Sequence, residues 1–234
     1  MRIILAVTAA VACRPMAPPP AVAFHGDTAA APVDTTTVML VLGMVTQGLT
    51  GGVGVALRAE RQVTTRTTAG LELTGGYGES DVPEGKRWLV GLRGYGRGTP
   101  RSRDWVAVTY GAGISVMDVG LVTVTAHAGG AVSYPNDYAA PFLGAGLALA
   151  IPLHQSERYG ASPASMPSMH GGQMPPTEPE AVGRALYWYL DGGFVALLGD
   201  TGNRLSLDVG VLSSLFSDHG LYSLSIAEAQ RFDP

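Results

Sequence analysis

The chain has 234 residues, enough for one domain with a full core, and only 15% of them are charged, against roughly 25% in an average soluble protein. The net charge of −4 and the lack of a basic stripe argue against a nucleic-acid partner, and the single cysteine, Cys13, rules out an intrachain disulfide. No uninterrupted apolar run approaches the ~18 residues of a membrane-spanning helix, so a closed β-barrel is the remaining way for this chain to cross a membrane.

The N-terminal residues predict an export signal. Arg2 is followed by an apolar stretch that ends in small residues and Cys13, which is the outline of a signal peptide over residues 1–12. The four residues ending at Cys13 resemble the lipobox of bacterial lipoproteins, which implies a lipid anchor on Cys13. An ordinary export signal cut after Ala23 is the alternative. Residues 13–34, rich in Pro and Ala and without periodicity, predict a linker.

Alternation of apolar with small or polar residues recurs through residues 35–234. It is clearest at residues 105–134, where two alternating segments flank a turn-like sequence at residues 118–120. A period of two bounded by turn residues predicts β-strands with a different environment on each face. Beside the two strands of this hairpin, the pattern predicts strands at residues 36–47, 52–61, 65–78, 87–97, 138–153, 185–198, 203–212 and 220–226.

These strands predict an all-β fold, an antiparallel up-and-down transmembrane β-barrel of about ten strands, with 8 to 12 as the range. The pattern resembles bacterial outer-membrane barrels, in which short turns lie on the periplasmic side and long loops outside. Residues 79–86 and a long extracellular loop at residues 154–183 are the expected outer connections. The second face is mostly Gly, Ala, Ser and Thr, which suits a narrow, filled lumen better than the charged exterior of a soluble barrel.

The polar face also carries a balanced set of charges, which predicts a salt-bridge network that closes the lumen. The symmetry of the hairpin around residues 79–86 places Glu72 opposite Arg93. A selective pore is the alternative, and it would require an excess of one sign along a continuous path. The predicted lumen charge network consists of Arg58, Glu60, Arg66, Glu72, Arg93, Asp191, Arg204 and Asp208.

His127 lies on the polar face, where Ser115, Ser133 or Asp191 could approach it. A histidine with a serine and a carboxylate is the arrangement of acyl-transfer enzymes. No spacing in the sequence identifies such a family, so we expect a hydrogen-bonded structural histidine, no enzyme and no cofactor.

The predicted loop at residues 154–183 contains a cluster of thioether and imidazole groups. These are soft ligands that favour Cu(I), so the cluster is a candidate metal site, with a proline-broken surface loop as the alternative. The candidate ligands are Met166, Met169, His170 and Met174.

Together these patterns predict a non-enzymatic surface or structural protein of the bacterial outer membrane. Its expected partners are outer-membrane lipids and the barrel assembly machinery, which recognises a C-terminal aromatic residue that Phe232 resembles. A small channel and a soluble, lipoprotein-type ligand-binding barrel are the alternatives.

Overall fold

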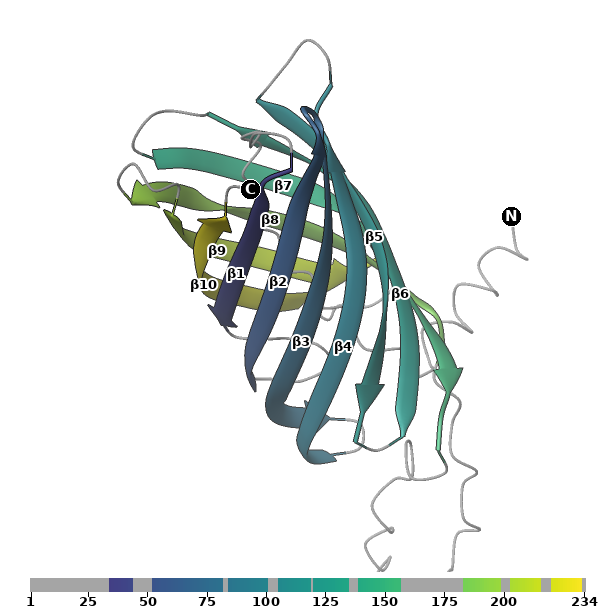
Figure 1. The fold of residues 1–234 in the computed structure, drawn as a ribbon. Coiled ribbons are helices and arrows are strands. Elements are labelled where there is room, and N and C mark those ends of the chain that lie inside the picture. Colours follow the sequence, from purple (N-terminus) through teal and green to yellow (C-terminus); the bar gives the residue numbers. More distant parts are fainter. Residues whose placement is uncertain are drawn as a thin grey trace, which may run out of the picture.

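The computed structural model describes residues 34–43, 52–81, 84–100, 105–118, 120–134, 139–156, 183–198, 203–215 and 220–232. In these ranges the chain forms ten strands that close into one antiparallel barrel, in which each strand pairs with its sequence neighbours and β1 pairs with β10 (Figure 1). The strands are β1 (Thr36–Gly43), β2 (Gly52–Thr64), β3 (Thr67–Asp81), β4 (Glu84–Gly98), β5 (Val106–Met117), β6 (Leu121–Ser133), β7 (Ala139–His154), β8 (Ala185–Leu198), β9 (Asn203–Ser214) and β10 (Gly220–Phe232). The predicted fold class and strand number are confirmed.

The barrel has two distinct ends. We call the end at which β1 begins and β10 finishes the terminal end, and the opposite end, where β7 runs into residues 155–184, the loop end. At the loop end Gly120 closes the turn between β5 and β6 with a φ of 80°, a conformation that only glycine adopts without a steric penalty. Cys13 and the Met166 to Met174 cluster lie outside the described residues.

Several boundaries differ from the sequence-based prediction. β10 continues to Phe232, although apolar alternation stops at Glu228, because its last residues pair with β1 and its outward side chains there lie at the rim of the barrel. β3 and β4 pair as far as Asp81 with Glu84, so the expected outer connection over residues 79–86 is wrong in length. The two strands therefore include residues that the local polarity had assigned to the connection.

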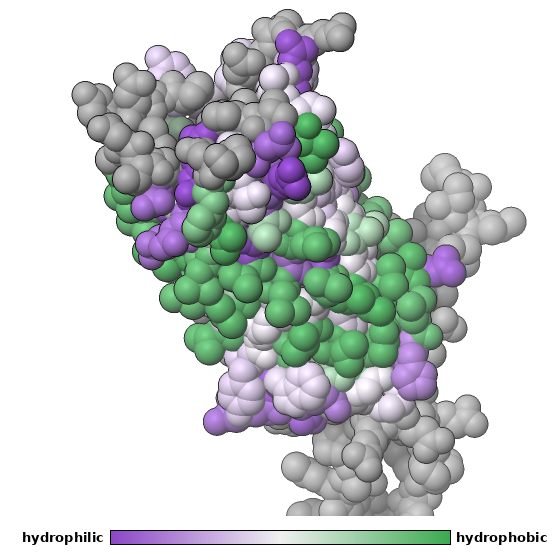
Figure 2. Space-filling model, in the orientation of Figure 1, coloured by the Kyte–Doolittle hydropathy of each residue, from purple (hydrophilic) through white to green (hydrophobic). Residues whose placement is uncertain are grey.

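The two faces of the sheet have opposite character. Large apolar side chains point outward and are exposed, with Leu71 at 62% and Val53 at 68%, whereas the polar side chains between them are buried. Figure 2 shows hydrophobic residues gathered in a band across the visible face, with hydrophilic residues toward both ends. We call the exposed apolar side chains on the outer face of the barrel the apolar belt; its members include Leu57, Leu73, Val90, Leu92, Ile114, Leu143, Leu147, Leu190, Val209 and Ile226.

Glycine makes room for bulky side chains inside the barrel. Tyr95 pairs with Gly70 across the β3–β4 ladder, and a Cβ atom on Gly70 would overlap the tyrosine ring. In the same way Gly144 lies opposite Asp191, whose carboxylate occupies the space of the missing Cβ. The high glycine content of the polar face is therefore a packing feature, because a narrow barrel holds large inward side chains only where the facing position is small.

Candidate functional site in the barrel interior

A buried ion cluster crosses the interior wall of β2, β3 and β4. The register places Arg58 opposite Glu72 and Glu72 opposite Arg93, as the sequence predicted for the second pair. Arg58 donates to Glu72 Oε2 from Nε at 2.9 Å and from Nη2 at 2.6 Å, and Arg93 Nη2 donates to the same oxygen at 2.9 Å. Arg93 Nη2 also lies 2.8 Å from Oε1, within ion-pair distance but without hydrogen-bond geometry. One carboxylate thus contacts two guanidinium groups, and Glu60 supplies the second negative charge that balances them.

Tyr95 completes this cluster. Its hydroxyl donates to Glu60 Oε1 at 2.6 Å, and Glu60 lies 4.0 Å from Arg58 Nη1. The Tyr95 ring is 5.0 Å from Arg58 Cζ and 5.6 Å from Arg93 Cζ, which is within cation–π range of both cations. We refer to Arg58, Glu60, Glu72, Arg93 and Tyr95 as the lumen cluster.

The lumen cluster is almost completely shielded from solvent. The side chain of Glu72 has no exposed surface, and those of Arg58 and Arg93 are 4% and 8% exposed. Charges at such sites must be paired, since an unpaired buried ion costs several kcal/mol. The cluster therefore fills the interior next to β2, β3 and β4 with fixed, mutually compensated charge.

A second set of polar groups lies on β8 and β9. Asp191 and Asp208 are buried at 5% and 4% exposure, and the β8–β9 register makes them diagonal neighbours on the inner face. Among the described residues neither oxygen of Asp191 has a hydrogen-bond partner. Within the described ranges, these two neighbouring carboxylates lack the direct arginine contacts that Glu72 has.

His127 is buried inside the barrel on β6, directly opposite Gly111. Because Asp191 accepts no hydrogen bond from any described residue, it does not orient His127 as the acid of a catalytic triad would. The arrangement of histidine, serine and aspartate that would indicate acyl chemistry is thus not formed through Asp191.

The remaining residues of the predicted charge network are Arg204 and Arg66, and they lie on different parts of the barrel. Arg204 is half-buried on the inner face of β9, toward the terminal end. Arg66 lies exposed in the two-residue turn between β2 and β3, outside the interior, because the turn falls later than the sequence indicated. Among the described residues, no group of three or more His, Cys, Asp or Glu side chains is placed to hold a metal ion.

Tyr95 is the member of the site that sequence analysis missed. Aromatic residues in membrane barrels usually lie on the outer face, near the ends of strands. The available signal was its parity: Tyr95 lies two residues after Arg93 and so shares its inward face, and it is flanked by Gly94 and Gly96.

Comparisons with known proteins find similar folds but no relative in sequence. No protein-family model matches the chain, and no curated protein matches it. The structure is similar to an outer membrane channel from Pseudomonas putida F1, with 11% identity over 90% of this chain and 100% of that one and a TM-score of 0.49. It is also similar to the translocator domain of the autotransporter NalP from Neisseria meningitidis, with 14% identity over 85% and 88% and a TM-score of 0.42.

A designed transmembrane β-barrel gives 13% identity over 87% of this chain and 100% of that one, with a TM-score of 0.34. Similarity at these identities and TM-scores concerns the fold alone and indicates no function. Within the described part of the chain, no helix is both long and apolar enough to cross a membrane.

Proposed function

We propose that this chain is a non-enzymatic protein of the bacterial outer membrane, a surface or structural barrel whose lumen is closed by the lumen cluster. The apolar belt supports the membrane position. An outward face in which Leu57, Leu73 and Leu92 are each about half exposed leaves a large hydrocarbon surface to be covered, and lipid tails cover such a surface without polar partners.

Aromatic residues border the belt at both ends of the barrel. Tyr77 and Trp88 are a cross-strand pair toward the loop end, and Trp105 and Tyr134 lie at the terminal end, all with exposed side chains. Amphipathic rings favour the interface between hydrocarbon and headgroups, so these positions fit the two edges of a bilayer. By the usual asymmetry of such barrels, the loop end faces the outside and the terminal end the periplasm.

The buried cluster of Arg58, Glu72 and Arg93 is the main observation in support of a closed lumen. A selective pore needs a solvated path lined by an excess of one charge. Here Glu72 and Glu60 together balance the charges of Arg58 and Arg93. Glu72 lies 2.6 Å from Arg58 and 2.8 Å from Arg93, Glu60 lies 4.0 Å from Arg58, and their side chains are largely shielded from solvent. Such a cluster favours a rigid, filled interior over conduction.

Fractionation of the expressed protein, followed by gel migration with and without boiling, tests the membrane position. We expect recovery in the outer-membrane fraction and a faster-migrating unboiled form, because a closed barrel resists unfolding by detergent. Recovery of folded protein in the soluble periplasmic fraction would overturn the proposal and would favour the soluble ligand-binding alternative.

Conductance in a planar bilayer tests the closed lumen against the small-channel alternative. We expect no single-channel steps from the folded wild type, and conducting events from a variant in which Arg58, Glu72 and Arg93 are all replaced by Ala. The control replaces Arg61 and Asp34 by Ala, an ion pair 3.0 Å apart that is exposed at 65% and 59% and lies outside the lumen. Steady conductance by the wild type would establish the channel instead.

A further inference from the structure

Within the described ranges, the barrel wall loses one strand where β1 ends. β1 has eight residues, the fewest of the ten strands, and its ladders finish at Gly43, which pairs with Ser225 of β10 and Gly54 of β2. Both neighbours extend further toward the loop end, β10 to Gly220 and β2 to Gly52. No described strand lies between these extensions, so each of them is paired on one side only within the described ranges.

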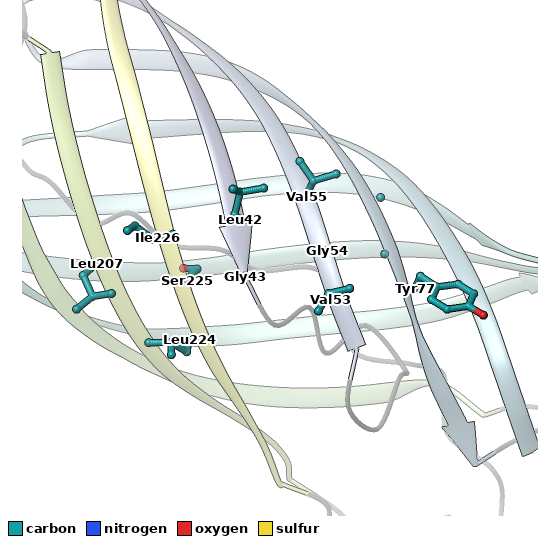
Figure 3. A pocket seen from close by; sticks show the side chains of 12 residues that line it. Leu42, Gly43, Val53, Gly54, Val55, Tyr77, Leu207, Leu224, Ser225 and Ile226 are labelled. Carbon is teal, nitrogen blue, oxygen red and sulfur yellow. The ribbon is translucent and has the colours of Figure 1, made fainter.

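A groove of about 810 Å³ occupies this part of the wall (Figure 3). Leu42, Val53, Val55 and Leu224 line it with apolar side chains, and Tyr77 stands at one side. Gly43, Gly54, Gly75 and Gly76 supply no side chains, which leaves the wall hollow there. Because inward-facing positions such as Gly43 and Ser225 share the lining with outward-facing Leu42 and Val53, the groove cuts into the thickness of the sheet.

We propose that this groove binds one acyl chain of a membrane lipid. The proposal rests on the membrane position proposed above, since only there does the groove open directly onto hydrocarbon. Its lining is apolar and continuous with the apolar belt through Leu42, Val55 and Ile226, so an occupant enters it from the bilayer without crossing water. Its volume lies within the range of roughly 300–1,000 Å³ typical of small-molecule sites.

An acyl chain fits this lining better than a protein segment does. Among the described residues that line the groove, none has a charged side chain, and hydroxyl groups come only from Ser225 and Tyr77. A peptide strand would bring backbone N–H and C=O groups along its whole length, whereas a hydrocarbon chain brings none.

Gly75 allows the groove to be filled without disturbing the sheet. It faces outward on β3, and a Cβ atom built on it would find only Val55 Cγ1, at 4.0 Å. A Gly75→Phe side chain would therefore project into open space within the groove. Gly94 is the matched control: it faces outward on β4, away from the groove, and its nearest neighbour would be Leu71 Cδ2 at 3.8 Å.

Native mass spectrometry of the purified full-length protein tests the proposal. Dipalmitoyl phosphatidylethanolamine is added to delipidated protein in detergent, and free palmitate is added in a parallel sample. We expect the wild type and Gly94→Phe to retain one phospholipid, and Gly75→Phe to bind it at least about tenfold more weakly, because excluding two methylenes already has that effect.

Three results would overturn the acyl-chain site. They are no retained phospholipid on the wild type, equal retention by Gly75→Phe, and retention of palmitate but not of phospholipid, which would assign the groove to free fatty acids. A dimer that Gly75→Phe dissociates would assign it to a second copy of the chain. Heat-modifiable migration is checked in every sample. If it is present but no lipid is retained, only the acyl-chain site is overturned. If the wild type lacks it, the proposed membrane barrel is overturned as well.

Discussion

Two parts of the inner wall, one on β2, β3 and β4 and the other on β8 and β9, both carry buried carboxylates, but these carboxylates differ in their partners. On β2, β3 and β4, Glu72 lies between two arginines and every charge has a close partner. On β8 and β9, Asp191 and Asp208 are equally buried, yet Asp191 accepts no hydrogen bond from the described residues. Burial alone therefore does not decide what a charge contributes to this fold. Its contribution depends on whether the neighbouring strand supplies a group of opposite charge.

This difference has a physical consequence for stability. Removing one member of a compensated buried cluster leaves the others as unpaired ions, which is strongly unfavourable. Removing an uncompensated carboxylate relieves a desolvation penalty instead. The same kind of substitution should consequently have opposite signs on the two walls.

The largest effect is expected from Glu72→Gln. It keeps the shape of the side chain but leaves Arg58 and Arg93 buried without their shared counter-charge, so we expect a loss of about 3–5 kcal/mol in unfolding free energy. Urea unfolding of the protein refolded into lipid vesicles measures it. A loss below about 1 kcal/mol would contradict the central role of this carboxylate.

A smaller loss is expected from Tyr95→Phe. This change removes the 2.6 Å hydrogen bond to Glu60 but keeps the ring within cation–π range of both guanidinium groups, so we expect a loss of about 2 kcal/mol. Tyr110→Phe, on the exposed outer face, is the control and should leave the urea midpoint unchanged. Equal midpoints for the two variants would remove Tyr95 from the lumen cluster.

Asp191→Asn should act in the opposite direction. It removes a buried charge that has no hydrogen-bond partner among the described residues, and we expect a gain of about 1 kcal/mol in unfolding free energy. The same urea titration at neutral pH tests the sign. If the variant is destabilised as strongly as Glu72→Gln, the carboxylates of the two walls contribute to stability in the same way, which contradicts the expected difference.

The smallest effect is expected from Arg61→Ala. The ion pair of Arg61 with Asp34 is well exposed on both sides, and screened surface pairs contribute about 0.5 kcal/mol or less. High salt should abolish even that difference, whereas it should leave the effect of Glu72→Gln nearly intact. A salt-sensitive Glu72→Gln effect would indicate that water reaches the lumen cluster.

Much of the fold could be predicted because strand periodicity is a local property. Alternation at Val53, Val55 and Leu57 assigns an outer face with no knowledge of the neighbouring strands. The pairing of Glu72 with Arg93 was also predictable, since a hairpin around one turn fixes the sum of the paired residue numbers. Arg66 was misplaced because turn position shifts by a few residues without any change in the alternating pattern.

The sequence by itself determined the strands, the two faces and the presence of buried charge in this protein. Only the tertiary structure decided that Tyr95 bonds to Glu60, since the two residues are 35 positions apart and meet only when β2, β3 and β4 lie side by side. It also decided where the wall is hollow, because the groove depends on Gly43, Gly54 and Ser225 meeting where β1 ends and β10 closes the barrel. Closure joins the first strand to the last, and no local pattern along the chain records that contact.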